Sequence, residues 1–242
     1  MNAIRPRLYL LDVEGTTSPI SLVYEQLFPY ARKHFRTFLE EQKGESETAA
    51  DLKLLAEENR AESAAHPPRF AFGDGADRAC DYLLWLMDQD RKSTALKSLQ
   101  GRIWKSGFEA GELIGTVFPD VPEAFARWTS PPRESKVAIY SSGSVEAQRL
   151  LFRYSSADDL TPLICGYFDT RVGVKTAKES YSAIAAAMGV ATSDVLFVSD
   201  VTRELDPARE AGCLTRLAVR EGNAAVAEGH RHQEIRSFSE ID

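Results

Sequence analysis

The stretch that decides the fold is Leu8-Tyr9-Leu10-Leu11-Asp12-Val13-Glu14-Gly15-Thr16-Thr17. Its first four residues form a short apolar run, which is the pattern of a strand buried on both faces. The run leads directly into Asp12 and Glu14, and period-two geometry points both carboxylates the same way past the strand end. Open α/β sheets bind their ligands at the carboxyl ends of strands. An acid at a strand end also often caps a following helix, so the rest of the chain has to decide between the two interpretations.

Bulk composition points to a soluble intracellular protein. The chain has 242 residues, of which 43% are hydrophobic, and it has no apolar run of membrane-spanning length. Residues 1–6 lack the apolar stretch of a signal peptide. The three cysteines are scattered and match no disulfide or metal-binding spacing. We therefore expect a cytoplasmic protein with no membrane partner.

The net charge argues against one class of partner. It is −7, and no basic cluster is long enough to follow a nucleic-acid backbone. Nucleic acid is therefore not an expected partner. An acidic protein can still bind a small anion when a metal ion and one or two cations lie at the site.

Two further apolar runs end in polar residues. Val137–Tyr140 leads into Ser141 and Ser142, and Val195–Val198 leads into Ser199 and Asp200. Helical patterns separate these runs, and strands that alternate with helices indicate a parallel sheet. The expected fold class is α/β with a Rossmann-like parallel sheet. The polar ends of all three strands then face one crevice.

A long helical segment interrupts this pattern immediately after the first strand. No clear strand signal occurs between Pro19 and Phe118, and the segment has the size of a small domain. We therefore expect an α/β core formed by residues 1–18 and 119–242, with an all-helical insertion at 19–118. Residues 214–219 are a further strand candidate, and Tyr167-Phe168 is expected beside short loops. His230-Arg231-His232 is expected to be a solvated loop rather than a metal site.

The acidic strand ends have the chemistry of a phosphate-processing site. Asp12, Glu14 and Asp200 supply hard oxygen ligands that suit Mg²⁺, and this ion readily bridges to a substrate phosphate. Asp12 can attack phosphorus and form an aspartyl-phosphate. Glu14 can protonate the leaving alcohol and later deprotonate the hydrolytic water.

The remaining candidates are suited to binding the phosphate itself. Ser141 or Ser142, with backbone amides at the start of a helix, can bind phosphate oxygens. Lys175 can neutralise them. Ser141 and Ser142 could instead be simple turn hydroxyls. Lys175 taken alone would be a surface lysine, and its place between the second and last motifs carries its assignment.

Asp12-Val13-Glu14-Gly15-Thr16, Ser141, Lys175 and Asp200 resemble the four motifs of haloacid-dehalogenase-superfamily phosphatases, whose core carries an inserted helical cap. Most members have Asp-x-Asp where this chain has Asp-x-Glu. With Leu27-Phe28-Pro29-Tyr30-Ala31, Leu99-Gln100-Gly101-Arg102-Ile103-Trp104, residues 140–148 and residues 199–204, the chain closely resembles one group in that superfamily. This group is the enolase-phosphatases of methionine salvage, the acireductone synthases.

The resemblance implies a reaction and a site. The reaction is Mg²⁺-dependent enolisation of 2,3-diketo-5-methylthiopentyl-1-phosphate, followed by loss of phosphate to give the acireductone. The implied metal ligands are Asp12, Glu14 and Asp200, and the implied substrate contacts are Ser141, Ser142 and Lys175. Glu204 is the nearest match to the second acid that usually follows the last motif, and its longer side chain favours a role outside the metal's direct ligands.

Two other functions remain open from the sequence. The first keeps the fold and chemistry but makes the protein a simple phosphatase acting on another small phosphate ester. The second is a binding or regulatory protein on an inactive phosphatase scaffold, against which the intact Asp12, Lys175 and Asp200 argue. The sequence does not determine the oligomeric state, and we expect a monomer.

Overall fold

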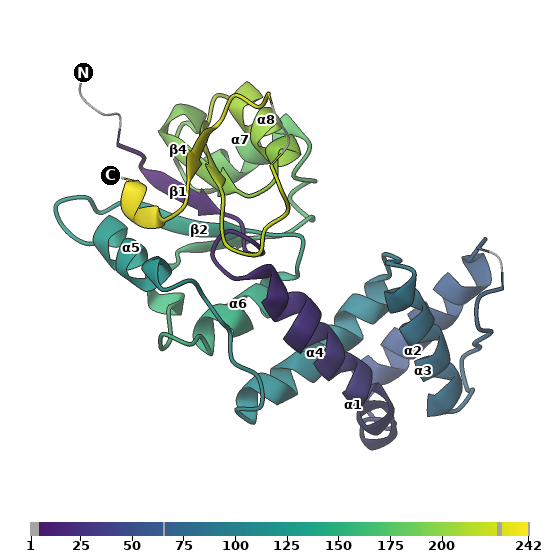
Figure 1. Ribbon diagram of the computed structural model, residues 1–242. Coiled ribbons are helices and arrows are strands. Elements are labelled where there is room, and N and C mark those ends of the chain that lie inside the picture. The colour runs from purple at the N-terminus through teal and green to yellow at the C-terminus, as the bar shows by residue number, and fades with distance from the viewer. Residues whose placement is uncertain (1–4, 65, 227–228, 242) are drawn as a thin grey trace. The chain divides into compact units, whose positions relative to one another are not determined.

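The computed structural model describes residues 5–64, 66–226 and 229–241, and these form two compact units (Figure 1). Met1–Tyr24 and Ile114–Asp242 form the first unit, and Glu25–Leu113 forms the second. The second unit is therefore shorter at both ends than the helical insertion expected at 19–118. Phe118 belongs to the first unit, where its amide donates to the Thr17 carbonyl at 3.0 Å.

The first unit is built on a parallel sheet. Over the described residues its order is β3-β2-β1-β4-β5-β6, and each strand runs parallel to its neighbours. The bounds are β1 Leu8–Leu11, β2 Lys136–Tyr140, β3 Gly166–Phe168, β4 Val195–Ser199, β5 Leu214–Ala218 and β6 Gln233–Ile235. β1 pairs with both β2 and β4, so every residue of β1 is buried. The predicted α/β fold with a parallel sheet is confirmed.

Helices cover both faces of this sheet, with α5 and α6 on one face and α7 and α8 on the other (Figure 1). The side chains of β1 point alternately to the two faces of the sheet. Leu8 and Leu10 belong to the apolar cluster that includes residues of α7 and α8. Tyr9 points the other way and stacks on Trp128 of α5, with 4.0 Å between the ring centroids. The bounds are α5 Asp120–Thr129, α6 Val145–Arg153, α7 Lys178–Ala187 and α8 Thr202–Glu210, with short helices η2 Thr161–Leu163, η3 Thr192–Asp194 and η4 Phe238–Glu240.

Tyr167 and Phe168, expected beside short loops, lie in the edge strand β3, which has loops on both sides. One expectation for this unit was wrong. The 230–232 segment is not simply solvated, because His232 is only 6% exposed. Its two ring nitrogens contact Thr215 Oγ1 at 2.9 Å and Asp206 Oδ1 at 3.1 Å. These contacts join β5 and α8 just before β6 begins.

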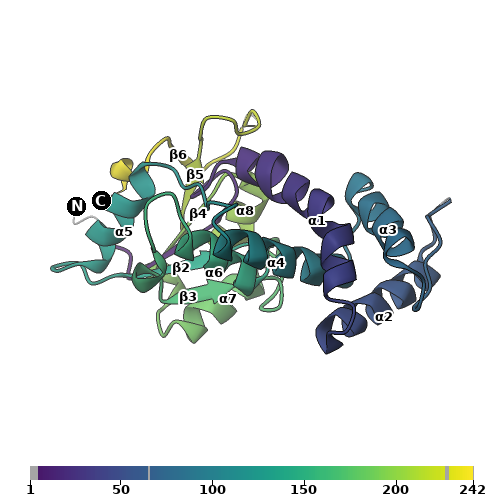
Figure 2. The same cartoon turned by 90° about the horizontal axis from the view of Figure 1, so that it is seen from below.

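The second unit is helical, and its described part contains no strand (Figure 2). A six-residue π-helix, η1 Leu22–Leu27, crosses the boundary into this unit and leads into α1. Ala31, Phe35 and Leu39 recur at helical spacing in α1 and are buried against the other helices. The bounds are α1 Phe28–Glu41, α2 Ser46–Ala61, α3 Ala76–Asp88 and α4 Thr94–Glu109. Across the described residues, no helix is long and apolar enough to cross a bilayer.

Candidate active site

Asp12 lies at the carboxyl end of β1, in the middle of the sheet, and is 3% exposed. Its amide donates to the Val198 carbonyl of β4 at 3.0 Å, which continues the strand pairing by one residue. Its Oδ1 accepts a hydrogen bond from the Val13 amide at 2.7 Å. The position and orientation of this carboxylate are therefore fixed by the sheet itself.

Lys175 provides the positive charge beside Asp12. Its Nζ lies 2.5 Å from Asp12 Oδ1 and 3.0 Å from Glu204 Oε2, and the residue is 8% exposed. Burial alone would lower the pKa of Lys175, but the carboxylates of Asp12 and Glu204 outweigh burial and raise it. Lys175 is therefore a buried ammonium ion rather than the surface lysine that its surroundings in the sequence would favour.

The Tyr181 hydroxyl contacts the backbone that carries Lys175. It lies 2.7 Å from the Lys175 carbonyl and 2.8 Å from the Glu204 carbonyl, so it connects the lysine loop to α8. Sequence reasoning missed this residue because Tyr181 reads there as an ordinary core residue of α7.

Glu204 is placed by the structure as a partner of the lysine. Ser199 Oγ lies 3.0 Å from Glu204 Oε2 and 3.3 Å from Asp12 Oδ2, which puts this hydroxyl between the two carboxylates. Burial and the nearby charge of Asp12 raise the pKa of Glu204. Glu204 and Ser199 thus form one network with Asp12 and Lys175, and Ser199, noted in the sequence only as the end of a strand, was not assigned a role in the site.

Glu14 is the second carboxylate of the first motif. Its Oε2 accepts a hydrogen bond from Ser141 Oγ at 3.2 Å, which joins the ends of β1 and β2. Burial and the charge of Asp12 raise the pKa of Glu14. A carboxyl group with a raised pKa can act as an acid and as a base near neutral pH.

Asp200 follows β4 and approaches the loop after Glu14. A Cβ atom at Gly15 would lie 2.5 Å from Asp200 Oδ2, so only glycine fits there, and its φ of +69° also favours glycine. Burial, with the charges of Asp12 and Glu204, raises the pKa of Asp200 to about 7. The structure therefore brings Asp12, Glu14, Lys175, Asp200 and Ser141 to one edge of the sheet.

Several backbone amides in the loop after β2 and at the start of α6 already donate to groups within the protein. Ser141 Oγ accepts from the Gly143 amide at 3.1 Å, and Ser144 Oγ caps α6 by accepting from the Ala147 amide at 3.1 Å. Asp169 Oδ2 accepts from the Val145 amide at 3.3 Å. These three amides are therefore engaged within the protein, although the start of α6 was expected to offer its amides to a phosphate. Ser142 lies exposed in the same loop.

The charges at this edge fit a bound cation. Asp12, Glu14, Asp200 and Glu204 are four carboxylates, and Lys175 is the one cation that forms an ion pair with any of them among the described residues. Over the same residues, no three acidic, histidine or cysteine side chains are already arranged to hold a metal ion. The donor set nevertheless consists of the hard oxygens that Mg²⁺ prefers, and buried negative charge without a partner is costly.

Comparison with known proteins identifies the family. Residues 6–212 match the family described as haloacid dehalogenase-like hydrolase. The chain is 51% identical to Enolase-phosphatase E1 of Synechococcus elongatus over 96% of both chains, and 44% identical to Enolase-phosphatase E1 of Pseudomonas aeruginosa over 96% of both. The crystal structure of the UTR4 protein of Saccharomyces cerevisiae matches with a TM-score of 0.79 and 34% identity, over 98% of this chain and 100% of that one. The resemblance seen in the motifs is thereby confirmed, and the chain is an enzyme that belongs to the haloacid dehalogenase-like hydrolases.

Proposed function

We propose that this enzyme converts 2,3-diketo-5-methylthiopentyl-1-phosphate to the acireductone and inorganic phosphate, with Mg²⁺ as its metal. The observation that carries the proposal is the pairing of the buried Asp12 carboxylate with the Lys175 ammonium at 2.5 Å, two residues before the half-buried Glu14 carboxylate. The relatives named Enolase-phosphatase E1 support the choice of reaction.

Phosphoryl transfer needs a nucleophile, a cation and an acid. An Asp12 carboxylate oxygen attacks phosphorus, the bond between phosphorus and the ester oxygen breaks, and the Glu14 carboxyl gives its proton to the departing oxygen. Lys175 offsets the charge of the transferring phosphoryl oxygens. Glu14, now a carboxylate, takes a proton from the water that attacks the aspartyl-phosphate, which releases phosphate and regenerates Asp12.

A metal ion held by Asp12, Glu14 and Asp200 would add charge stabilisation for the phosphoryl group and for an enolate oxygen. Asp200 suits this role because burial and two acidic neighbours disfavour its charge when no cation is present. Ser141, Ser142 and Lys175 are the proposed contacts to the substrate phosphate.

Enolisation needs a base that removes a proton from a carbon beside a carbonyl. Glu14 is the proposed base, since burial and Asp12 raise its pKa towards the range in which a carboxylate accepts protons effectively. The same carboxyl then carries that proton when it acts as the acid for the leaving oxygen. A base supplied by the helical unit is the alternative, and we propose that this unit serves as the cap that selects the substrate.

The test follows the two products separately. The purified protein is mixed with the diketo-phosphate and Mg²⁺, while ultraviolet absorbance reports the enol and a phosphate assay reports the second step. The proposal expects an enol signal followed by stoichiometric phosphate, and Glu14→Gln should suppress the enol. Phosphate release from other small esters, with no enol formed from the diketo-phosphate, would instead indicate a simple phosphatase. Normal enolisation by Glu14→Gln would move the base to another residue.

A further inference from the structure

Arg220, two residues beyond β5, contacts the loop that carries Glu14. Its Nε donates to the Thr16 carbonyl at 3.2 Å, although the two residues are far apart in sequence. The side chain is buried, and its guanidinium carbon lies 4.6 Å from the centre of the Phe118 ring and 4.7 Å from that of Phe238. An arginine held between two aromatic faces loses most of its freedom to move.

The same arginine is anchored on the side away from the loop. Its Nη1 donates to Asp120 Oδ2 at 2.9 Å and to the Arg236 carbonyl at 2.8 Å. Asp120 also accepts hydrogen bonds from Ser237 and from the Phe238 amide, so α5 and the C-terminal segment share this anchor.

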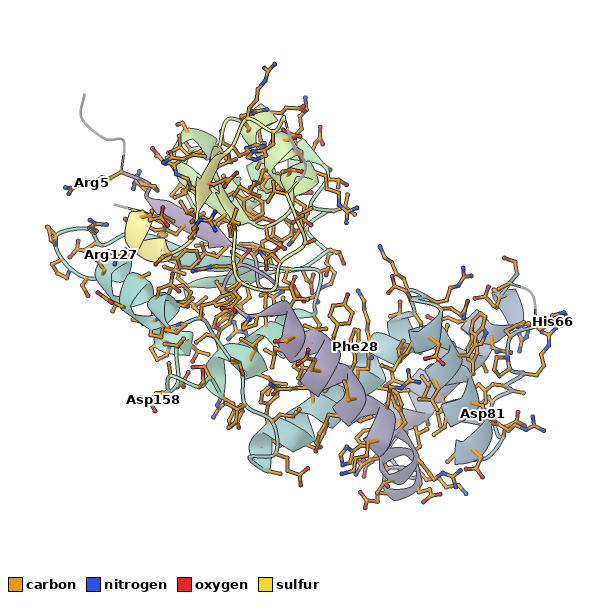
Figure 3. All side chains as sticks on the ribbon, in the orientation of Figure 1. Arg5, Phe28, His66, Asp81, Arg127 and Asp158 are labelled. Carbon is orange, nitrogen blue, oxygen red and sulfur yellow. The ribbon has the colours of Figure 1, made fainter. Side chains whose placement is uncertain are left out.

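A second arginine holds the C-terminal segment in place. Arg127 of α5, labelled in Figure 3, donates to the Phe238 carbonyl at 2.8 Å and to the Ile241 carbonyl at 3.1 Å. The segment whose Arg236 carbonyl and Phe238 ring contact Arg220 is therefore joined to α5 by these hydrogen bonds as well.

Asn223 contacts the carbonyl that comes one residue earlier in the loop. Its Nδ2 donates to the Gly15 carbonyl at 2.9 Å and to the Ala218 carbonyl at 3.3 Å. Two carbonyl partners fix the orientation of the amide, because the flipped form would place oxygen against oxygen. The Asn223 amide donates to the Arg220 carbonyl at 3.2 Å, and Gly222 has a φ of +86°, so a tight turn directs both side chains to one loop.

The two carboxylates of the first motif depend on this support to different degrees. Asp12 is held by strand pairing with Val198 and by Lys175, and neither contact involves the turn at 220–223. Glu14 lies beyond the strand, where the Ser141 hydroxyl donates to its carboxyl at 3.2 Å. The turn after Glu14 has hydrogen bonds of its own, such as the Gly15 amide to the Ser18 carbonyl at 2.8 Å, and Arg220 and Asn223 additionally hold its Thr16 and Gly15 carbonyls.

We propose that Arg220 and Asn223 are positioning residues for Glu14: by holding the Thr16 and Gly15 carbonyls they fix the Glu14 carboxyl where it protonates the leaving oxygen. This inference rests on the proposed acid role of Glu14. It assigns a role to a turn that touches neither the phosphate nor the nucleophile.

The test compares two aryl esters that differ in their need for an acid. Phenol has a pKa of about 10, like a tyrosine side chain, whereas p-nitrophenol is a much better leaving group. Loss of acid catalysis should therefore slow phenyl phosphate hydrolysis more than p-nitrophenyl phosphate hydrolysis. Glu14→Gln supplies the reference for a complete loss of the acid.

Asn223→Ala and Arg220→Met are the test variants, and Arg216→Met is the matched control. Arg216 lies on β5, and its Nη1 donates to the Thr215 carbonyl rather than to the loop after Glu14. We expect both test variants to lose on the order of tenfold in kcat/KM with phenyl phosphate and much less with p-nitrophenyl phosphate. Thermal unfolding of each variant shows whether it is folded at the assay temperature, and Asn223→Ala leaves the Arg220–Asp120 ion pair intact if Arg220→Met unfolds.

Four results would overturn the inference or its basis. Equal losses with both esters would assign the turn a general structural role, and unchanged kinetics in Asn223→Ala would show that its contact is dispensable. If Glu14→Gln itself shows no dependence on the leaving group while the wild type releases phosphate, the acid role of Glu14 fails rather than the contacts of the turn. Absence of any phosphate release from either ester or from the diketo-phosphate by the wild type would refute the proposed function.

Discussion

Asp12 and Glu14 are separated by one residue, yet their surroundings differ. Asp12 receives a hydrogen bond from the Val13 amide and an ion pair from Lys175. The Glu14 carboxyl accepts a hydrogen bond from Ser141 and has no direct ion pair among the described residues, and it shares with Asp200 a pKa raised first by burial and then by the charge of Asp12. The protein thus holds the Asp12 carboxylate in one orientation, and it disfavours charge on Glu14 and Asp200, which suits proton transfer or a bound cation.

The largest expected effect comes from removing the charge that pairs with Asp12. Lys175→Met leaves Asp12 and Glu204 buried without their cation, and the ammonium can no longer offset the charge on the phosphoryl oxygens. We expect kcat/KM to fall on the order of a hundredfold or more, as for a lost charge-assisted contact of a few kcal/mol. Breaking a buried ion pair should also lower stability by about 3 kcal/mol.

The matched control for this variant is Lys136→Met. Lys136 begins β2, and its Nζ donates to the Met188 carbonyl, so it is not part of the site network. Steady-state kinetics and thermal unfolding of both variants make the comparison. A Lys175→Met enzyme within about twofold of the wild type, a difference of less than 1 kcal/mol, would show that this ammonium does not serve the reaction.

The next prediction concerns the metal ion that the carboxylates of the site are proposed to hold. Excess chelator should abolish phosphate release, and Mg²⁺ should restore it. In unfolding experiments, Mg²⁺ at about a hundred times its Kd should stabilise the wild type by about 2.7 kcal/mol, because it binds the native state. Asp200→Asn should lose most of this stabilisation, since one of the proposed ligands is gone.

Asp194→Asn is the control for the metal prediction. Asp194 immediately precedes β4, whereas Asp200 follows it, and its partner is Arg7 at the surface. Its response to Mg²⁺ should match that of the wild type. Full activity in excess chelator, or an undiminished Mg²⁺ response in Asp200→Asn, would remove the metal assignment.

The smallest effect separates burial from the influence of neighbouring charge. Cys213 has no acidic neighbour that contributes to its shift, and burial alone raises its pKa to about 12. It should therefore remain a thiol at pH 8 and react with iodoacetamide far more slowly than a free cysteine, and its rate should rise with pH throughout the range in which the fold is stable. Mass spectrometry of alkylated peptides measures the rate. Rapid labelling of native Cys213 at pH 8 would show that burial raises the pKa of interior groups less than expected.

The sequence predicted those parts of the site that lie at the ends of strands. Asp12, Ser141 and Asp200 each follow a strong apolar run, so strand geometry alone brings them together. Lys175 needed the order of motifs along the chain, because a lysine in a polar segment normally lies at the surface.

The rest depended on contacts between distant parts of the chain. Arg220 reaches Thr16 and Asn223 reaches Gly15 across more than two hundred residues, and no local pattern marks either residue. β6 was missed because it is a three-residue edge strand with two exposed residues, which leaves almost no apolar periodicity to detect. His232 was misassigned because its polar neighbours in sequence conceal its burial against β5 and α8.

The most direct test of the account is whether the phosphoryl group passes through Asp12. In a single turnover quenched in acid, peptide mass spectrometry of the wild type should find one phosphoryl group on the peptide that contains Asp12. Asp12→Asn should show none and should release no phosphate, while still forming some phosphorylated enol because Glu14 remains. Phosphate release by Asp12→Asn at the wild-type rate, or a wild-type turnover with no phosphoryl group on this peptide, would contradict covalent catalysis by Asp12.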